Sequence, residues 1–148
     1  MDTKLTFKEY NAALKENRLL GLRCRRCQTT TAPPRMVCRK CSSPELDVVP
    51  LSGRGAVQTF TTVFVAAEGR QDETPYIIVI VELDEGPWLM GNLAGIDRDK
   101  VTMELIGRRV TMSHRLFPGD KYSAGDCASP LFTLETQAPP RPVAKGTA

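Results

Sequence analysis

The chain has 148 residues, of which 41% are hydrophobic and 25% are charged, a composition typical of a soluble globular protein. No apolar run approaches the ~20 residues that a membrane-spanning helix needs, and the N-terminus does not resemble a secretory signal, so we expect a cytoplasmic protein with no membrane partner. The charge is unevenly spread, with a net charge of +6 in residues 1–55 and −3 in residues 56–148.

The first predicted element is an N-terminal helix within residues 1–21. Thr6 and Glu9 have the spacing of a capping box, and Gly21 is a suitable end. An apolar stripe at helical spacing is formed by Phe7, Tyr10 and Leu14. A short helix must bury such a stripe, either against the chain's own second domain or against another subunit, and the sequence does not decide between these two arrangements.

Residues 22–50 contain four of the five cysteines, in a C-x2-C-x10-C-x2-C pattern: Cys24, Cys27, Cys38 and Cys41. Each two-residue gap lets a pair of sulfurs curl round one metal, and ten residues suffice for a hairpin that brings the pairs together. We therefore predict a zinc ribbon, with iron as the alternative metal and disulfides disfavoured in a reducing compartment. Four thiolates close the coordination sphere, so this metal is expected to be structural and not catalytic.

Six basic residues surround the cysteines: Arg23, Arg25, Arg26, Arg35, Arg39 and Lys40. Such a surface should attract an anion, either a nucleic acid, a nucleotide-bearing cofactor such as coenzyme A, or an acidic protein surface. An ordinary solvated charged face explains the pattern equally well. The stretch 42–50, which follows the cysteines, is interpreted as a connection.

Residues 51–136 have a β pattern, which begins with two glycines that permit a bend into a curved strand. The predicted strands are 56–67, 76–83, 88–94, 109–117 and 131–135. A long interruption between the third and fourth strands is typical of an OB-fold barrel. The predicted fold class is therefore mainly β, with an N-terminal helix, a four-cysteine zinc ribbon, a five-stranded OB-fold barrel and a disordered tail at 137–148.

Candidates for catalysis are few. His114, the only histidine, shares a strand face with apolar residues, which favours a hydrogen-bonded barrel histidine over a general base. Cys127 lies outside the quartet in a predicted loop, and without a neighbouring base we expect an inert thiol. We predict no catalytic residues.

Four stretches carry a resemblance to a known family: LRCRRC…PPRMVCRKC, PLSGRGAVQTFTTV, PYIIVIVELDEGPWLMGNLAGI and IGRRVTM…PLFTL. Together they span about residues 5–135, and the combination is more specific than the cysteine spacing alone. The chain resembles small proteins that join a rubredoxin-like zinc ribbon to an OB-fold and accompany thiolases or thiolase-like aldolases. It departs from them at Gln28, where a glycine is usual, and at 45–49, where an aromatic residue is often found.

The resemblance implies a non-catalytic accessory subunit of a thiolase (acyltransferase) complex acting on acyl-CoA. A thiolase-like partner would hold the catalytic residues, and this chain would support assembly and help to form the coenzyme A site. Because guanidinium groups bind phosphates well, Arg26, Arg35 and Arg39 are the candidates for its nucleotide end. A subunit of the benzylsuccinate-pathway thiolase is one candidate match.

Two other functions compete with this interpretation. A single-stranded nucleic-acid-binding protein is the alternative, because OB-folds bind single strands and the ribbon is basic. Such a protein should carry exposed aromatic residues among its basic ones, and the barrel half is instead acidic and aliphatic. A stand-alone thioesterase would have to hydrolyse acyl-CoA through His114 or Cys127.

Overall fold

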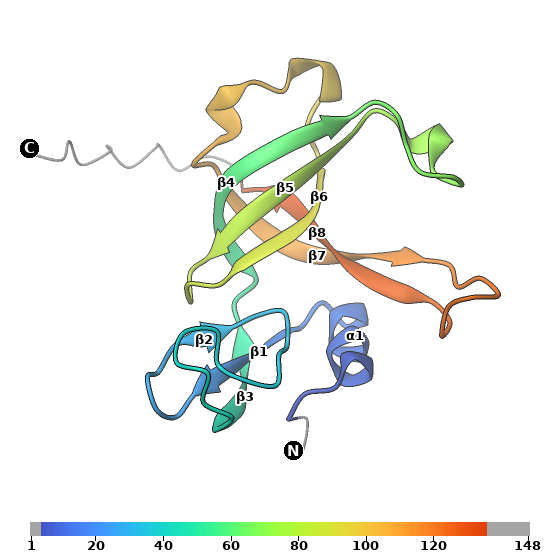
Figure 1. The fold of residues 1–148 in the computed structure, drawn as a ribbon. Helices are drawn as coiled ribbons and strands as arrows, with labels where there is room; N and C mark the ends of the chain where they lie inside the picture. The colour runs from blue at the N-terminus through green and yellow to red at the C-terminus, as the bar shows by residue number, and fades with distance from the viewer. Residues whose placement is uncertain (1–3, 136–148) are drawn as a thin grey trace, which may run out of the picture.

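The computed structural model describes residues 4–135, so the predicted tail at 137–148 lies outside the described residues. The fold is mainly β, as predicted, with one helix, a small ribbon sheet and a closed barrel (Figure 1). The helices are α1 (Phe7–Lys15), η1 (Gln71–Glu73), η2 (Arg98–Lys100) and η3 (Met103–Leu105). The strands are β1 (Leu19–Cys24), β2 (Thr30–Thr31), β3 (Leu46–Leu51), β4 (Arg54–Val63), β5 (Tyr76–Leu83), β6 (Trp88–Ala94), β7 (Arg109–Phe117) and β8 (Cys127–Leu134).

Helix α1 begins with the predicted capping box. The backbone N–H of Glu9 donates to Thr6 Oγ1 at 3.2 Å, and the backbone N–H of Thr6 donates to Glu9 Oε2 at 2.8 Å. The helix ends at Lys15, so the prediction that it continues towards Gly21 is wrong. Asn17 adopts a left-handed φ of 58°, which stops the helix, and the apolar residues that follow belong to β1.

The apolar stripe of α1 is divided between the interior and the surface. Tyr10 and Leu14 are buried in the core of the chain itself, whereas Phe7 is 68% exposed. The buried carboxamide of Asn11 bonds to β8: its Nδ2 donates to the carbonyl of Ala128 at 3.1 Å, and its Oδ1 accepts from the N–H of Ala128 at 3.3 Å. The helix therefore packs on its own barrel.

No helix within residues 4–135 is long and apolar enough to cross a membrane.

The ribbon sheet has the order β2-β1-β3. Strand β3 pairs antiparallel with the whole of β1, from Leu19 opposite Leu51 to Cys24 opposite Leu46. The prediction of a simple connection over 42–50 is therefore wrong. Asp47 weakened the strand pattern there, but it lies opposite Arg23 and forms an ion pair with Arg25 at 2.6 Å.

The barrel has the strand order β4-β5-β6-β8-β7 and closes through β4 and β7. The bounds of β5, β6 and β7 agree with the predicted strands, while β4 ends earlier than expected and β8 begins four residues earlier, at Cys127. The core residues Val57, Val79, Val110 and Phe132 are fully buried. Two long connections, β4–β5 and β7–β8, extend away from the barrel as neighbouring arms (Figure 1).

Glu73, in η1, holds these two arms together. Its carboxylate accepts from Arg70 on the same arm and from Arg115 on β7, and these guanidinium groups hold the pKa of Glu73 below its usual value against an opposing desolvation. The Arg70 guanidinium also lies 4.2 Å from the ring centre of Tyr76. The arms are therefore tied to the barrel at their base.

Because Leu14 is 1% exposed, Leu14→Ala should lower the free energy of unfolding by about 2–5 kcal/mol through loss of apolar contacts and a residual cavity. Phe7→Ala is the matched control on the same helix and should change stability by less than about 0.5 kcal/mol. Urea unfolding of both variants measures the difference. Equal effects at the two positions would contradict the packing of α1 on its own barrel.

Candidate functional site: a four-cysteine centre beside an apolar groove

The four predicted ligand cysteines come from two turns with the same backbone geometry. The N–H of Gln28 donates to the carbonyl of Cys24 at 2.9 Å, and the N–H of Ser42 donates to the carbonyl of Cys38 at 3.0 Å. Gln28 and Ser42 both have a left-handed φ, of 62° and 58°. A glycine would adopt this conformation at lower cost than either residue.

The sulfur atoms of these cysteines converge. All four lie within 4.8 Å of one another, with 3.6 Å between the Sγ atoms of Cys24 and Cys41 and 3.5 Å between those of Cys27 and Cys38. A tetrahedral site with Zn–S distances of about 2.3 Å requires sulfur separations of about 3.8 Å. The backbone N–H groups of Arg26 and Lys40 point at Cys24 Sγ and Cys38 Sγ, each at 3.4 Å, and stabilise negative charge on sulfur. The donor set fits one tetrahedral metal ion with no open position.

The protonation of the cluster also favours a cation. Hydrogen bonds from the side chain and backbone of Thr29 lower the pKa of Cys27 to about 6. The Ser43 amide favours the thiolate of Cys41, but desolvation and the three neighbouring sulfurs together raise the pKa of Cys41 to about 11. Without a cation the cluster therefore retains a proton at neutral pH, because adjacent thiolates repel one another. A divalent metal would remove this repulsion.

The arginines proposed for coenzyme A lie on different parts of the ribbon. Arg26 is in the first cysteine turn, and Arg35 is in the loop before the second; both side chains are exposed. Arg39 donates through Nε to the carbonyl of Thr30 at 2.9 Å. Its guanidinium also approaches the β5–β6 turn, 3.7 Å from where a Cβ on Gly86 would lie. Ribbon and barrel therefore meet at Arg39.

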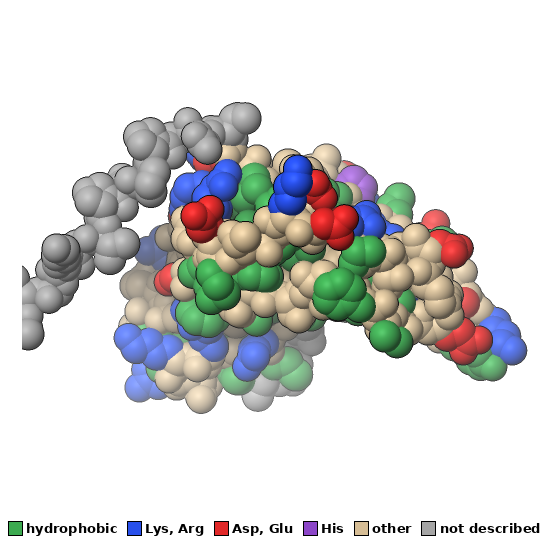
Figure 2. Space-filling model, turned by 90° about the horizontal axis from the view of Figure 1, so that it is seen from above, with side chains coloured by type: hydrophobic (Ala, Val, Ile, Leu, Met, Phe, Trp, Pro, Cys, Tyr) green, Lys and Arg blue, Asp and Glu red, His purple; other side chains and the backbone are tan. Residues whose placement is uncertain are grey.

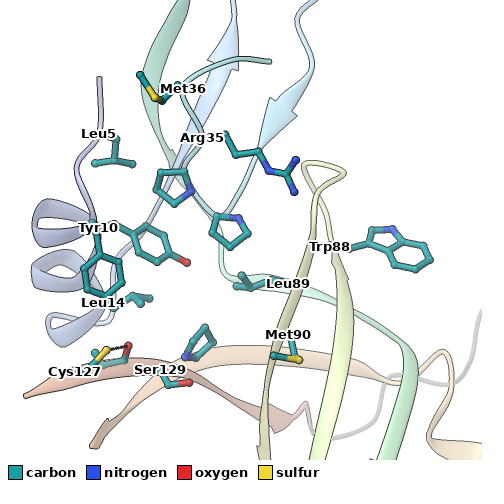
Figure 3. Close-up of a pocket in the computed structure, with 15 residues that line it drawn as sticks. Leu5, Tyr10, Leu14, Arg35, Met36, Trp88, Leu89, Met90, Cys127 and Ser129 are labelled. Carbon is teal, nitrogen blue, oxygen red and sulfur yellow. Dashed lines mark hydrogen bonds between the residues drawn. The ribbon is translucent and has the colours of Figure 1, made fainter. Parts of the chain in front are cut away.

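A groove of about 650 Å³ lies where the helix, the ribbon and the barrel come together (Figure 3). Its walls come from residues 5–14, 33–36, 88–90 and 127–130, and most of the surface is apolar. In Figure 3 Tyr10, Leu14 and Leu89 point towards one another in the groove, while Trp88 points away from it. Of the three candidate arginines, Arg35 lines the groove. Sequence reasoning missed this site because its four walls are far apart along the chain.

Cys127 and His114 do not form a catalytic pair. Cys127 is the first residue of β8 and lines the groove, so its predicted position in a loop is wrong; its Sγ accepts from Asn11 Nδ2 at 3.3 Å. Across the β7–β8 ladder, Cys127 lies opposite Phe117, whereas His114 lies opposite Pro130. His114 Nδ1 lies 2.6 Å from Asn17 Oδ1, as expected for a hydrogen-bonded barrel histidine.

We predict one structural zinc ion per chain, measured by native mass spectrometry. Cys38→Ser should lose the ion and unfold the ribbon, because loss of a ligand removes folding free energy. Cys127→Ser, which changes the cysteine outside the cluster, should keep the full metal content. A wild-type chain that stays folded without metal would contradict the assignment.

Family models match the chain in two adjoining segments. Residues 12–47 match the model described as "ChsH2, rubredoxin-like zinc ribbon domain", and residues 48–115 match "ChsH2, C-terminal OB-fold domain". The two matches meet at the start of β3. They confirm the combination of domains that the sequence motifs indicated.

Individual relatives agree with these matches. A DUF35 domain-containing scaffold protein of Methanocaldococcus jannaschii is 35% identical over 62% of this chain and 69% of its own length. The benzoylsuccinyl-CoA thiolase subunit BbsA of Geobacter metallireducens is 36% identical over 52% of this chain, which spans 51% of that protein. The solved structure titled "Ltp2-ChsH2(DUF35) aldolase" contains a chain that is 31% identical, with a TM-score of 0.64 and coverage of 84% and 91%. This chain therefore belongs to the family that joins a rubredoxin-like zinc ribbon to an OB-fold and includes ChsH2 and the DUF35 domain-containing scaffold proteins.

Proposed function

We propose that this chain is a non-catalytic, cytoplasmic subunit of a hetero-oligomeric thiolase-type complex that acts on acyl-CoA. It supports assembly of the complex and contributes to the coenzyme A site. The observation that carries the proposal is the chemistry of the groove, whose lining within the described part of the chain is mostly apolar and supplies no carboxylate or imidazole base. The names of the thiolase subunit and the aldolase chain among its relatives support the same class of complex.

The groove is poorly equipped for chemistry of its own. Among residues 4–135, its ionisable side chains are Tyr10, Arg35 and Cys127, and neither a carboxylate nor an imidazole of that part of the chain lines it. Burial raises the pKa of Tyr10 to about 12, so the phenol stays protonated at neutral pH. Nucleophilic attack by a thiol needs an adjacent base or another means of lowering its pKa, and the ring of His114 bonds to Asn17 instead. Acyl transfer therefore requires residues from a partner chain.

The rim of the groove supports a role in assembly. Four large apolar side chains line the groove and are more than half exposed: Phe7, Met36, Trp88 and Met90. Clusters of exposed aromatic and methionine side chains are characteristic of protein interfaces. A thiolase-like subunit would cover this rim.

Charge placement supports a contribution of the ribbon to coenzyme A binding. Arg25 is neutralised by Asp47, whereas Arg26 and Arg35 have no ion-pair partner among residues 4–135. The barrel face seen in Figure 2 carries both signs of charge without a continuous basic stripe. Arg26 and Arg35 are therefore our candidates for binding the phosphates of coenzyme A.

Affinity purification of the full chain from its source cells, followed by native mass spectrometry, tests the proposed function. A thiolase-like chain should co-purify in a defined stoichiometry, and acyl-CoA turnover should require both chains. Turnover of acyl-CoA by this chain alone would contradict the proposal. Recovery of single-stranded nucleic acid in place of a thiolase-like chain would also contradict it.

In the assembled complex, Arg35→Ala should raise KM for acyl-CoA roughly tenfold or more, as expected from the loss of a charged hydrogen bond of about 1.5–3 kcal/mol. The value of kcat should change little, because a contact to the nucleotide end is equally strong in the ground and transition states. Arg23→Ala, on the same ribbon, is the matched control and should leave both constants unchanged. Unaltered kinetics in the Arg26/Arg35/Arg39 triple alanine variant, with the complex intact, would limit the chain to structural support.

A further inference from the structure

Strands β6 and β8 pair over only part of their length. The two strands run parallel and pair from Asn92 to Ala94, opposite Leu131 to Thr133. The preceding residues 88–90 and 127–130 form two walls of the groove. One edge of β6 therefore has no strand partner over residues 88–91 within the described part of the chain.

The hydrogen-bonding pattern identifies which backbone groups lie on this edge. The N–H of Leu83 donates to the carbonyl of Pro87 at 2.9 Å, which makes Leu83 and Pro87 a hydrogen-bonded pair of the β5–β6 hairpin. Bonded and non-bonded pairs alternate along an antiparallel ladder, so Trp88 and Met90 occupy non-bonded pairs with β5. Their N–H and C=O groups consequently point away from β5, towards the groove.

Pro130 explains why the pairing of β6 with β8 does not extend beyond Asn92 towards Trp88. In the parallel register that places Asn92 opposite Leu131, the carbonyl of Met90 would next accept from the backbone nitrogen of residue 130. Proline has no N–H, so this bond cannot form. The strands are still close at Gly91, where a Cβ would lie 2.6 Å from the carbonyl oxygen of Pro130, and they diverge beyond it.

Asn11 occupies the other wall. By bonding to both the N–H and the C=O of Ala128, its carboxamide takes the place of a neighbouring strand along β8. Those groups are no longer available to β6. The backbone groups of Ala128 on β8 are thus hydrogen-bonded by the helix. The backbone N–H and C=O groups of Trp88 and Met90 that face the groove have no partner among residues 4–135.

A second unpaired group faces the same space. Tyr10 is only 6% exposed and lines the groove. Its hydroxyl makes no hydrogen bond with any described residue. Figure 3 shows its hydroxyl directed into the groove. Although the ring is buried, the hydroxyl oxygen is not sealed in the core, so an occupant of the groove can bond to it. An occupant of this groove should therefore offer an acceptor to Tyr10 as well as a complement to the β6 edge.

We propose that an extended segment of the partner subunit enters this groove and adds as a strand beside Trp88–Met90. A peptide backbone presents donors and acceptors at strand spacing, which an acyl chain cannot do, and about three or four residues would span this edge. Alternate side chains of the segment would be apolar and would pack on Leu14 and Tyr10. This inference rests on the proposed function, because it takes the thiolase-like subunit as the source of the segment.

Backbone amide exchange of the co-purified complex and of the isolated chain tests the inference. The amide protons of Trp88 and Met90 should exchange about tenfold or more slowly in the complex, since pairing converts exposed N–H groups into ladder bonds. The amides of Leu89 and Gly91, which already pair with β5, serve as the internal reference. Protection of the Trp88 and Met90 amides in the isolated chain would show that the edge is already paired, and would overturn the inference.

A proline substitution separates the contribution of the Met90 backbone N–H to partner binding from that of the Met90 side chain. Met90→Pro removes the N–H assigned to the groove, and proline is tolerated at an edge strand whose N–H is not needed, so the isolated chain should remain folded. Met90→Ala shortens the side chain but retains the N–H. We expect Met90→Pro to bind the partner about 2- to 10-fold more weakly than Met90→Ala, and Tyr10→Phe to weaken binding by a similar factor.

The outcomes distinguish this inference from the proposed function. An intact complex without added protection at the amides of Trp88 and Met90, or equal affinities of Met90→Pro and Met90→Ala, would overturn the inference and leave the proposed function standing. Slower exchange at these two amides on adding dodecanoyl-CoA to the isolated chain would assign the groove to an acyl chain, and would also overturn it. Failure of any thiolase-like chain to co-purify would refute the proposed function and the inference with it.

Discussion

The convergence of four sulfur atoms is the constraint on which the N-terminal half depends. The ribbon contributes few fully buried apolar side chains, among them Leu22 and Leu46, and a segment of this size cannot bury enough surface to fold unaided. Bringing the two cysteine turns together fixes the C-terminal end of β1 at Cys24, opposite the start of β3 at Leu46. It also fixes the 33–36 loop, which supplies one wall of the groove.

Helix α1 joins the ribbon to the barrel through a shared core. Its buried face joins Leu22 and Leu46 to the barrel core, and its Asn11 binds β8 through hydrogen bonds in place of a strand. Phe7, Met36, Trp88 and Met90 remain exposed around the groove in the described part of the chain. Assembly with a partner is consistent with this division, because the core residues are already buried within the chain, whereas the apolar residues at the rim of the groove are still exposed.

Local patterns predicted much of the fold, and long-range contacts account for the rest. The cysteine spacing, the capping box at Thr6 and the apolar run of β5 are signals contained in a few neighbouring residues, so the ribbon, the helix start and the central strands could be predicted. Strand β3 could not, because Asp47 breaks its pattern and only the pairing with β1 makes it a strand. The groove depends on a proline in β8 meeting β6, and no periodicity in the sequence reports that contact.

Pro130 also bears on solubility. An open strand edge is a template on which other chains can build sheets, and proteins usually protect such edges with charge, bulges or covering elements. Here the open part of β6 is three or four residues long and forms one wall of the groove, whose other walls include Phe7 and Met36. A single strand can enter this groove, but its own far edge would face Asn11 and β8, which are already hydrogen-bonded. The arrangement therefore ends strand addition after one step and prevents growth of an intermolecular sheet.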